Sequence, residues 1–131
     1  MRWRSTVSLF GKAPPMIKRV GNYEVLHEVV EHNGILYLSG IVAEDTTLGM
    51  AGQTTQALEQ LARLLEENGS GLDRILQTLI FVTDMKLKPE MNRAWKAFFN
   101  NPEHLPARAT LGIASLEEGE LIEIVTTAAV R

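Results

Sequence analysis

An arginine near the C-terminal end of the chain stands inside a short apolar segment. Arg108 lies between Ala107 and Ala109, so in a β-strand its side chain points away from both alanines. Its planar guanidinium can hold a carboxylate by two parallel hydrogen bonds. The segment therefore supplies a candidate anion-binding residue. The alternative is an ordinary ion pair between this arginine and a glutamate at an interface.

A glutamate occupies a similar position in the next apolar segment. In a strand, Glu123 shares its face with Leu121 and Val125. An apolar setting disfavours the ionised carboxylate and raises its pKa, whereas a nearby cation would lower it. A raised pKa suits a carboxylate that activates water near neutral pH. Glu123 is therefore a candidate catalytic residue, and the alternative is a structural glutamate in an ion pair.

Four further residues could line a binding site with these two. Ser39 precedes Gly40 at a predicted strand end, where a glycine lets a ligand approach the backbone, and a serine hydroxyl with a free backbone N–H could hold a carboxylate oxygen. Asn92 lies one step from the apolar stripe of a predicted helix, at the rim of a cleft or in solvent. Thr110 shares the strand face of Arg108. A plain strand end explains Ser39 equally well.

Several kinds of site are missing from the sequence. The three histidines, His27, His32 and His104, have neither metal-binding spacing nor an acidic cluster around them. There is no cysteine, no phosphate-binding loop and no dinucleotide fingerprint. A formal charge of -3 and a pI near 5.6 give no net positive field for nucleic acids or acidic membranes. We therefore expect no metal, no cofactor, no nucleic acid and no membrane partner.

The composition indicates one domain. A chain of 131 residues with 45% hydrophobic residues fits a single core, and no apolar run reaches the ~20 residues of a membrane helix. Residues 1–15 contain basic residues and end at a pair of prolines, so we expect an N-terminal extension before a single domain over 16–131. Organelle targeting is an alternative role for that extension. The lack of cysteine suits a reducing compartment, and we expect a cytoplasmic protein.

Apolar periodicity and turn residues predict the elements. Asn33-Gly34 predicts a hairpin turn between two strands. Two amphipathic helices are predicted, one in residues 50–69 and one over about 89–100, with a buried strand in 75–85 between them. Two more strands follow in 107–114 and 121–130. The predicted order is β-β-α-β-α-β-β.

This order predicts a two-layer α/β (α+β) domain, in which two helices cover one face of a mixed β-sheet. The other face would expose an apolar patch, so we expect a homo-oligomer. If the last two strands formed a plain hairpin, Ala128 would lie opposite Arg108, and Glu123 would lie roughly 17 Å away along the strand. We therefore expect a pocket that takes Arg108 and Glu123 from two subunits.

A spaced pattern near the C-terminus resembles a family signature. The pattern is Pro106-Ala107-Arg108-Ala109-x-Leu111-x-x-Ala114-x-Leu116, then five residues, then Ile122-Glu123-Ile124. It resembles the RidA/YjgF family, the reactive intermediate imine deaminases, which also carry the label endoribonuclease L-PSP. The resemblance covers roughly residues 16–131 and includes "LYLSG", "FVTD" and "MNRAWKAFF". It implies a chorismate-mutase-like fold and a homotrimer with clefts at the three subunit interfaces.

The resemblance also implies roles for residues. In that family the arginine that matches Arg108 grips the substrate carboxylate, and the glutamate that matches Glu123 positions or activates water. The residues that match Ser39 and Asn92 line the same pocket. The chain departs from the family pattern at Leu26, where deaminases commonly carry a tyrosine. Tyr23 lies near that position but out of register with it.

The function implied is hydrolysis of reactive 2-imino or 2-enamino acids to 2-keto acids and ammonia. The chain would be a hydrolase of the 2-iminobutanoate/2-iminopropanoate deaminase type that needs no cofactor. One alternative is a non-enzymatic sensor or carrier that binds a small carboxylate in the same pocket. Another is a ribonuclease, against which the acidic balance and the lack of a visible general acid and base pair argue.

Overall fold

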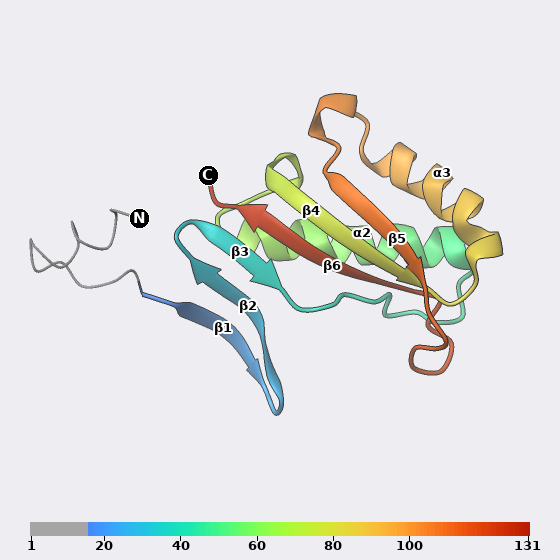
Figure 1. The fold of residues 1–131 in the computed structure, drawn as a ribbon, viewed down its shortest axis with the longest axis horizontal. Helices are drawn as coiled ribbons and strands as arrows, with labels where there is room; N and C mark the ends of the chain where they lie inside the picture. The colour runs from blue at the N-terminus through green and yellow to red at the C-terminus, as the bar shows by residue number, and fades with distance from the viewer. Residues whose placement is uncertain (1–15) are drawn as a thin grey trace, which may run out of the picture.

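The computed structural model describes residues 16–131, so the expected extension over 1–15 lies outside the described residues. Eight helices and strands of this region position the site (Figure 1). In chain order they are β1 (Lys18–Tyr23), β2 (Leu26–His32), β3 (Ile35–Leu38), α2 (Met50–Glu67), β4 (Ile75–Val82), α3 (Lys88–Phe98), β5 (Ala107–Gly112) and β6 (Ile122–Ala129). Every strand and helix predicted from the sequence is present.

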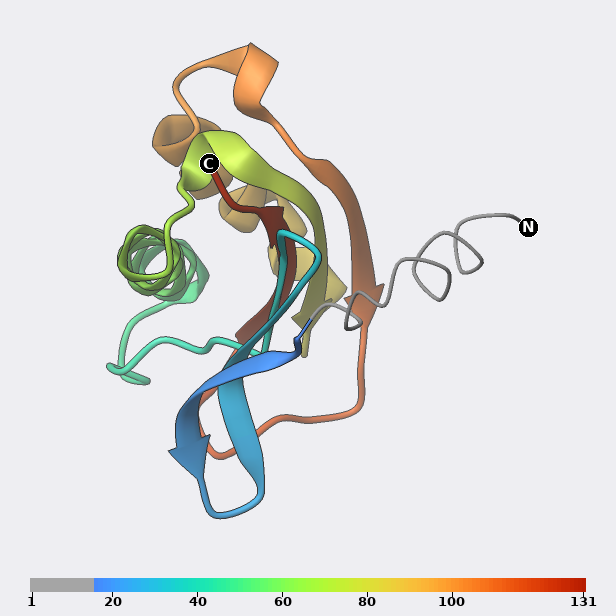
Figure 2. The same ribbon diagram turned by 90° about the vertical axis from the view of Figure 1, so that its left-hand side faces the viewer.

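One mixed sheet runs through the domain, in the order β1-β2-β3-β6-β4-β5. The β4–β5 pair is parallel, and the other pairs are antiparallel. Figure 2 shows α2 and α3 on the same side of this sheet. The predicted two-layer architecture is therefore confirmed.

The structure adds one strand to the predicted order. Lys18–Tyr23 forms β1, an edge strand that pairs with β2 and extends the sheet beyond the predicted hairpin. Its sequence, KRVGNY, places five of six residues in exposed positions. Such a strand lacks the alternation of apolar and polar residues by which strands are predicted. Strand β1 forms in spite of this composition because its backbone pairs with β2.

Local sequence explains the other element boundaries. Asn33 and Gly34 both have positive φ, 53° and 77°, as a tight hairpin turn requires. Helix α2 buries one apolar stripe against the sheet and ends before Gly69, whose φ is 78°. Helix α3 carries Pro89 in its first turn, where the missing N–H is not needed. These features confirm the predicted turn, helix end and helix start.

Strands β5 and β6 do not form the plain hairpin that the sequence left open. Strand β4 lies between β5 and β6, and Thr78 of β4 is aligned with both Arg108 and Thr126. The residue of β6 that is level with Arg108 is therefore Thr126 and not Ala128. The polar segment between β5 and β6 connects strands that do not pair, because β4 pairs with β5 in parallel and takes the central position.

No element of residues 16–131 covers the sheet face opposite the helices. Register places Leu79, Phe81, Leu111 and Val125 on this face, and Leu111 is 43% exposed. Tyr37 of β3 is 51% exposed. The uncovered apolar face that the sequence predicted is therefore present. Among residues 16–131, no helix is both long and apolar enough to cross a membrane.

Candidate functional site

Arg108 lies beside α3 in a hollow on the helix side of the sheet. Its Nη2 donates a hydrogen bond of 2.8 Å to the Asn92 Oδ1, and its guanidinium carbon lies 5.1 Å from the centre of the Trp95 ring. The hollow has a volume of about 360 Å³. Its lining consists of Asn92, Trp95, Lys96, Leu105, Pro106 and Arg108. We call it the arginine pocket.

The elements fix this arrangement. Arg108 is aligned with Thr78, which is buried on the helix side, so the guanidinium is directed toward α3. Asn92 and Trp95 are three residues apart on α3 and therefore lie on adjacent positions of one helix face. Trp95 belongs to the buried face of α3 and is only 4% exposed. The structure also shows Trp95 in contact with Arg108. The three-residue spacing between Asn92 and Trp95 is the sequence signal that could have placed both residues beside the arginine.

The charge of Arg108 has no acidic partner within residues 16–131. The ion pairs of this region join Arg131 to Glu66 and to Asp73. Partial burial lowers the pKa of Arg108 from its ordinary value, although a guanidinium remains charged at neutral pH. The neighbours of the guanidinium, Asn92 and Trp95, are neutral. Arg108 therefore forms no ion pair within the described residues, and the alternative of a pair with a glutamate at an interface stays a prediction.

Glu123 lies in a different pocket, where β2 and the segment after β3 approach β6. This pocket has a volume of about 530 Å³. Its lining consists of Tyr23, Val25, Leu26, Glu28, Ser39, Gly40, Ile41, Val42, Gln60 and Glu123. We call it the glutamate pocket. It brings together three of the residues that the sequence singled out: Ser39, Gly40 and Glu123.

Gly40 makes room for the Glu123 carboxylate. A Cβ at position 40 would lie 2.5 Å from the Glu123 Oε2 and 2.6 Å from its Cδ, which is closer than nonbonded atoms approach. The absence of a side chain at this position therefore allows the carboxylate to lie over the Gly40 backbone. Gly40 lines this pocket, and its N–H donates to no backbone group of residues 16–131.

The environment of Glu123 raises its pKa above the ordinary value. Burial is the main cause, and the negative charge of Glu120 adds to it. This direction agrees with the prediction made from the apolar neighbours of Glu123. The cation that would oppose the shift lies in the other pocket.

Ser39 is placed as expected, but its donors are already used. Its hydroxyl donates to the His27 carbonyl oxygen at 2.8 Å, and its backbone N–H donates to the Glu28 carbonyl oxygen at 3.0 Å. Both Ser39 donors are therefore used within the chain, and a substrate-binding role for Ser39 stays a prediction. Ser39 instead ties the end of β3 to β2, and its hydroxyl oxygen can still accept a hydrogen bond.

Tyr23 brings a phenol into the glutamate pocket. Leu26 occupies the position at which the family deaminases commonly carry a tyrosine, and in sequence Tyr23 is out of register with that position. In the structure Tyr23 is directly paired with Leu26 across the β1–β2 turn, and both residues line the pocket. The Tyr23 hydroxyl lies 3.5 Å from the Glu28 Oε2. The strand β1 that carries Tyr23 was not predicted, so this placement was missed.

A buried glutamine holds the segments around Glu123. Gln53 of α2 is fully buried, and its amide nitrogen donates to the carbonyl oxygens of Leu48 and Gly119 at 3.0 Å and 2.9 Å. Its amide oxygen accepts from the Leu121 N–H at 2.9 Å. These bonds tie the segment before α2 to the segment that leads into β6. Sequence reasoning missed this residue, because a glutamine on a helix normally faces solvent.

The side chains of Arg108 and Glu123 point to opposite faces of the sheet. Arg108 is aligned with Thr126 through Thr78, and Glu123 is three residues from Thr126, so its side chain points to the other face. Three residues of strand correspond to about 10 Å, and the intervening strand β4 adds about 9.5 Å. One chain therefore cannot present both side chains to one small molecule.

Thr110 joins neither of these pockets. It shares the sheet face of Arg108, as predicted, because Thr110 is aligned with Ile80 and Arg108 with Thr78. Its hydroxyl oxygen is buried and has no hydrogen-bond partner within the described chain. The expected lining role of Thr110 is therefore not realised in the arginine pocket of a single chain.

Comparison with known proteins identifies the family. Residues 16–130 match the family model described as Endoribonuclease L-PSP. A RutC family protein of Haemophilus ducreyi is 32% identical over 115 residues, which cover 88% of this chain and 97% of the relative. The RutC family protein YoaB of Escherichia coli is 35% identical over 103 residues, which cover 79% and 89% of the two chains.

Solved structures agree with this match. The crystal structure of a YjgF family member from Neisseria meningitidis superimposes with a TM-score of 0.82 at 34% identity and covers 88% of this chain and 96% of its own. This similarity confirms the chorismate-mutase-like fold that the resemblance implied. The family-model match spans nearly all of the described residues and carries both Arg108 and Glu123. The chain therefore belongs to the RidA/YjgF family.

Proposed function

We propose that this protein hydrolyses reactive 2-imino or 2-enamino acids to 2-keto acids and ammonia, in a pocket between subunits of a homotrimer. The observation that carries the proposal is the state of Arg108. Its guanidinium lines a hollow, its neighbours Asn92 and Trp95 are neutral, and no carboxylate of residues 16–131 pairs with it. Such a guanidinium is available for a carboxylate ligand.

Arg108 and its neighbours would fix the substrate carboxylate. The bond to Asn92 uses one of the five N–H donors of the guanidinium, so enough donors remain for two parallel bonds to a carboxylate. Lys96 also lines the arginine pocket and adds a second positive charge. Two cations and no acid in one hollow favour binding of a small anion.

Glu123 would handle water and protons. The oxygen of a water molecule held by its carboxylate forms a bond to the imine carbon, and the proton released passes to the carboxylate. The proton then passes from the carboxylate to the nitrogen, the carbon–nitrogen bond breaks, and ammonia leaves with the bonding electrons while the Glu123 carboxylate takes the remaining hydroxyl proton and the carbonyl forms. A protonated imine is already electrophilic, so the water and proton steps need contribute only about 10²- to 10⁴-fold to the rate.

This chemistry requires two copies of the chain, because Arg108 and Glu123 point to opposite sheet faces. The uncovered apolar face, which carries Leu111 and Val125 beside the position of Glu123, is the surface through which we propose that copies assemble. Because Arg108 lies on the edge strand β5, an assembly through this face would place the arginine pocket of one copy beside the glutamate pocket of the next. The composite pocket would then hold the carboxylate and the attacking water together.

Mixing two inactive variants tests this composite site. We expect Arg108→Ala and Glu123→Gln each to abolish hydrolysis of imines that an amino-acid oxidase generates in the assay. Co-expression with two different tags and purification through both gives trimers of mixed composition. Each mixed trimer would contain one site with both residues intact, so we expect about one third of wild-type activity to return.

Controls must separate loss of catalysis from loss of folding or assembly. Each variant purified alone must show the wild-type oligomer size and circular dichroism, so that inactivity is not caused by misfolding. If the mixed trimers stay as inactive as the separate variants, the two residues do not act in a shared intersubunit site. If Arg108→Ala alone keeps full activity, the arginine does not hold the substrate and the proposal fails.

A second function, a non-enzymatic sensor or carrier of small carboxylates, is favoured by one observation. The arginine pocket is complete within a single chain, whereas Glu123 is not beside it. Carboxylate binding therefore does not need the residue that activates water. Binding of a small 2-keto acid by calorimetry, lost in Arg108→Ala and accompanied by no acceleration of imine hydrolysis over buffer, would select this function over the enzymatic one.

A further inference from the structure

The two pockets carry opposite charge. The charged residues that line the arginine pocket are Lys96 and Arg108, and it contains no acid. The charged residues that line the glutamate pocket are Glu28 and Glu123, and it contains no lysine, arginine or histidine. A ligand that spans both pockets would therefore meet cations at one end and carboxylates at the other.

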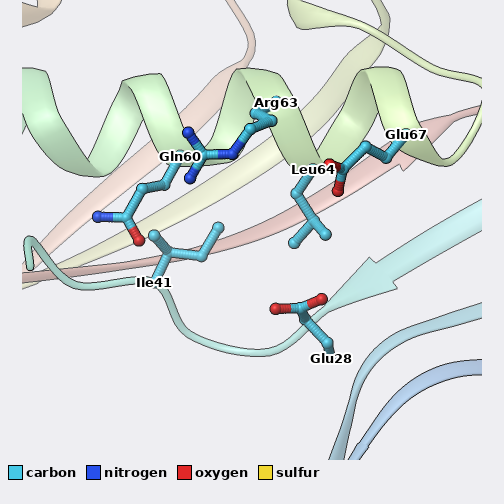
Figure 3. A pocket seen from close by; sticks show the side chains of 6 residues that line it. All are labelled: Glu28, Ile41, Gln60, Arg63, Leu64 and Glu67. Carbon is cyan, nitrogen blue, oxygen red and sulfur yellow. The ribbon is translucent and has the colours of Figure 1, made fainter.

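Glu28 has no assigned task in the proposed hydrolysis. Its carboxylate lines the glutamate pocket, yet Glu123 already accounts for water and proton transfer. Glu28 makes no ion pair within residues 16–131. Figure 3 shows its carboxylate directed from β2 toward α2, where it also borders a smaller pocket lined by Arg63 and Glu67. Within residues 16–131, Glu28 forms no ion pair with Arg63, and Arg63 does not line the glutamate pocket.

The groups around Glu28 are suited to a cation with several donors. The Gln60 amide nitrogen donates to the Val42 carbonyl oxygen at 3.0 Å, which leaves the amide oxygen as an acceptor in the same pocket. Tyr23, 57% exposed at the rim, offers a ring face on which a planar guanidinium can stack. A carboxylate, an amide oxygen and an aromatic face together match a guanidinium better than an ammonium group.

We propose that the preferred substrate is a 2-imino acid whose side chain ends in a cationic group, a guanidinium above all, and that Glu28 is the specificity-determining residue for it. This inference rests on the proposed function and names the substrate class. The carboxylate of the substrate lies against Arg108 and Lys96 of one subunit. The cationic end lies against Glu28 and Tyr23 of the neighbouring subunit.

The test compares two imines of similar chain length and different charge. An amino-acid oxidase generates them in the assay from L-arginine and from L-norleucine, and release of the 2-keto acid is followed. We expect kcat/KM for the arginine-derived imine to exceed that for the norleucine-derived imine by about 10-fold or more, because a charge-assisted hydrogen bond is strong. In Glu28→Gln this preference falls about 10-fold, chiefly through KM for the cationic imine.

Glu67→Gln is the matched control. It removes the same charge from α2 beside Glu28, but Glu67 does not line the glutamate pocket. We expect it to keep the wild-type preference. Equal kcat/KM for the two imines in the wild type, or the same loss of preference in both variants, would overturn the inference, because the selection would then be absent or due to overall charge.

Calorimetry with the free amino acids separates this inference from the proposed hydrolysis. L-Arginine should bind more tightly than L-norleucine in the wild type, and Glu28→Gln should remove the difference. If no imine is hydrolysed but this binding pattern is found, hydrolysis is wrong and the role of Glu28 stands. If imines are hydrolysed and arginine has no advantage in binding or turnover, hydrolysis stands and the role of Glu28 is refuted.

Discussion

Replacement of Gly40 by alanine should impair turnover without disturbing the fold. The added Cβ would lie 2.5 Å from the Glu123 Oε2 and 2.6 Å from the Glu123 Cδ, and ordinary contacts begin near 3.5 Å. The carboxylate must therefore retreat by about 1 Å. A displacement of 1 Å in a catalytic group costs about 10² in rate. We expect kcat for imine hydrolysis to fall about 100-fold in Gly40→Ala.

The same substitution should leave stability and substrate affinity nearly unchanged. The atoms in the way are the end of a flexible side chain, so the shift costs about 1 kcal/mol, and the loss of glycine from the unfolded chain offsets about 0.4–1 kcal/mol. Arg108 is untouched, so KM should change little. Steady-state kinetics and urea unfolding measure both quantities.

Gly49→Ala is the matched control for this prediction. A Cβ at position 49 would meet no atom within 4 Å, and the backbone there has a φ of -76°, which alanine adopts readily. We expect this variant to keep wild-type kcat. Gly40→Ala with kcat within about 3-fold of the wild type would show that the position of the Glu123 carboxylate does not limit the reaction. A large rise in KM at constant kcat would contradict the assignment of Glu123 to the chemical step.

Two further predictions follow from the surroundings of Glu123. Because only the ionised carboxylate can take a proton from water, and because burial raises its pKa above the ordinary 4.5, kcat should decline on acidification with a midpoint above pH 4.5. A pH profile checks this, and Glu123→Gln should lack that limb. Gln53→Leu should lower the free energy of unfolding by about 2–4 kcal/mol, because the Leu121 N–H and the Gly119 carbonyl lose their buried partner. Urea unfolding with an unchanged m-value would confirm this loss. A loss below about 0.5 kcal/mol would refute the role of Gln53 in holding these segments together.

The sequence was sufficient to predict the elements that are specified by residues close together in the chain. The Asn33-Gly34 turn, the apolar stripe of α2 and the proline in α3 each depend on residues close in the chain, and each was predicted correctly. Strand β1 was missed because its polar residues have no intrinsic preference for a strand and follow the pairing with β2. Local patterns carry no information about such a partner.

The site was predictable in its parts but not in their arrangement. The alternation around Arg108 and Glu123 correctly predicted two strands with one charged side chain each, and the family pattern contains the same pair. Their relative position depended on the insertion of β4 between β5 and β6, which no spacing in the last thirty residues reveals. Likewise, the carbonyl oxygens that use the Ser39 donors belong to β2, so their effect becomes visible only once the strands are paired.

The contacts of Arg108 also bear on how a very small metabolite could be bound. A free arginine side chain has about 2 kcal/mol of rotamer entropy, which a ligand would otherwise have to suppress. The Asn92 amide and the Trp95 ring restrict that freedom as the chain folds, before any ligand arrives. A bound carboxylate then does not have to supply the free energy that orders this side chain.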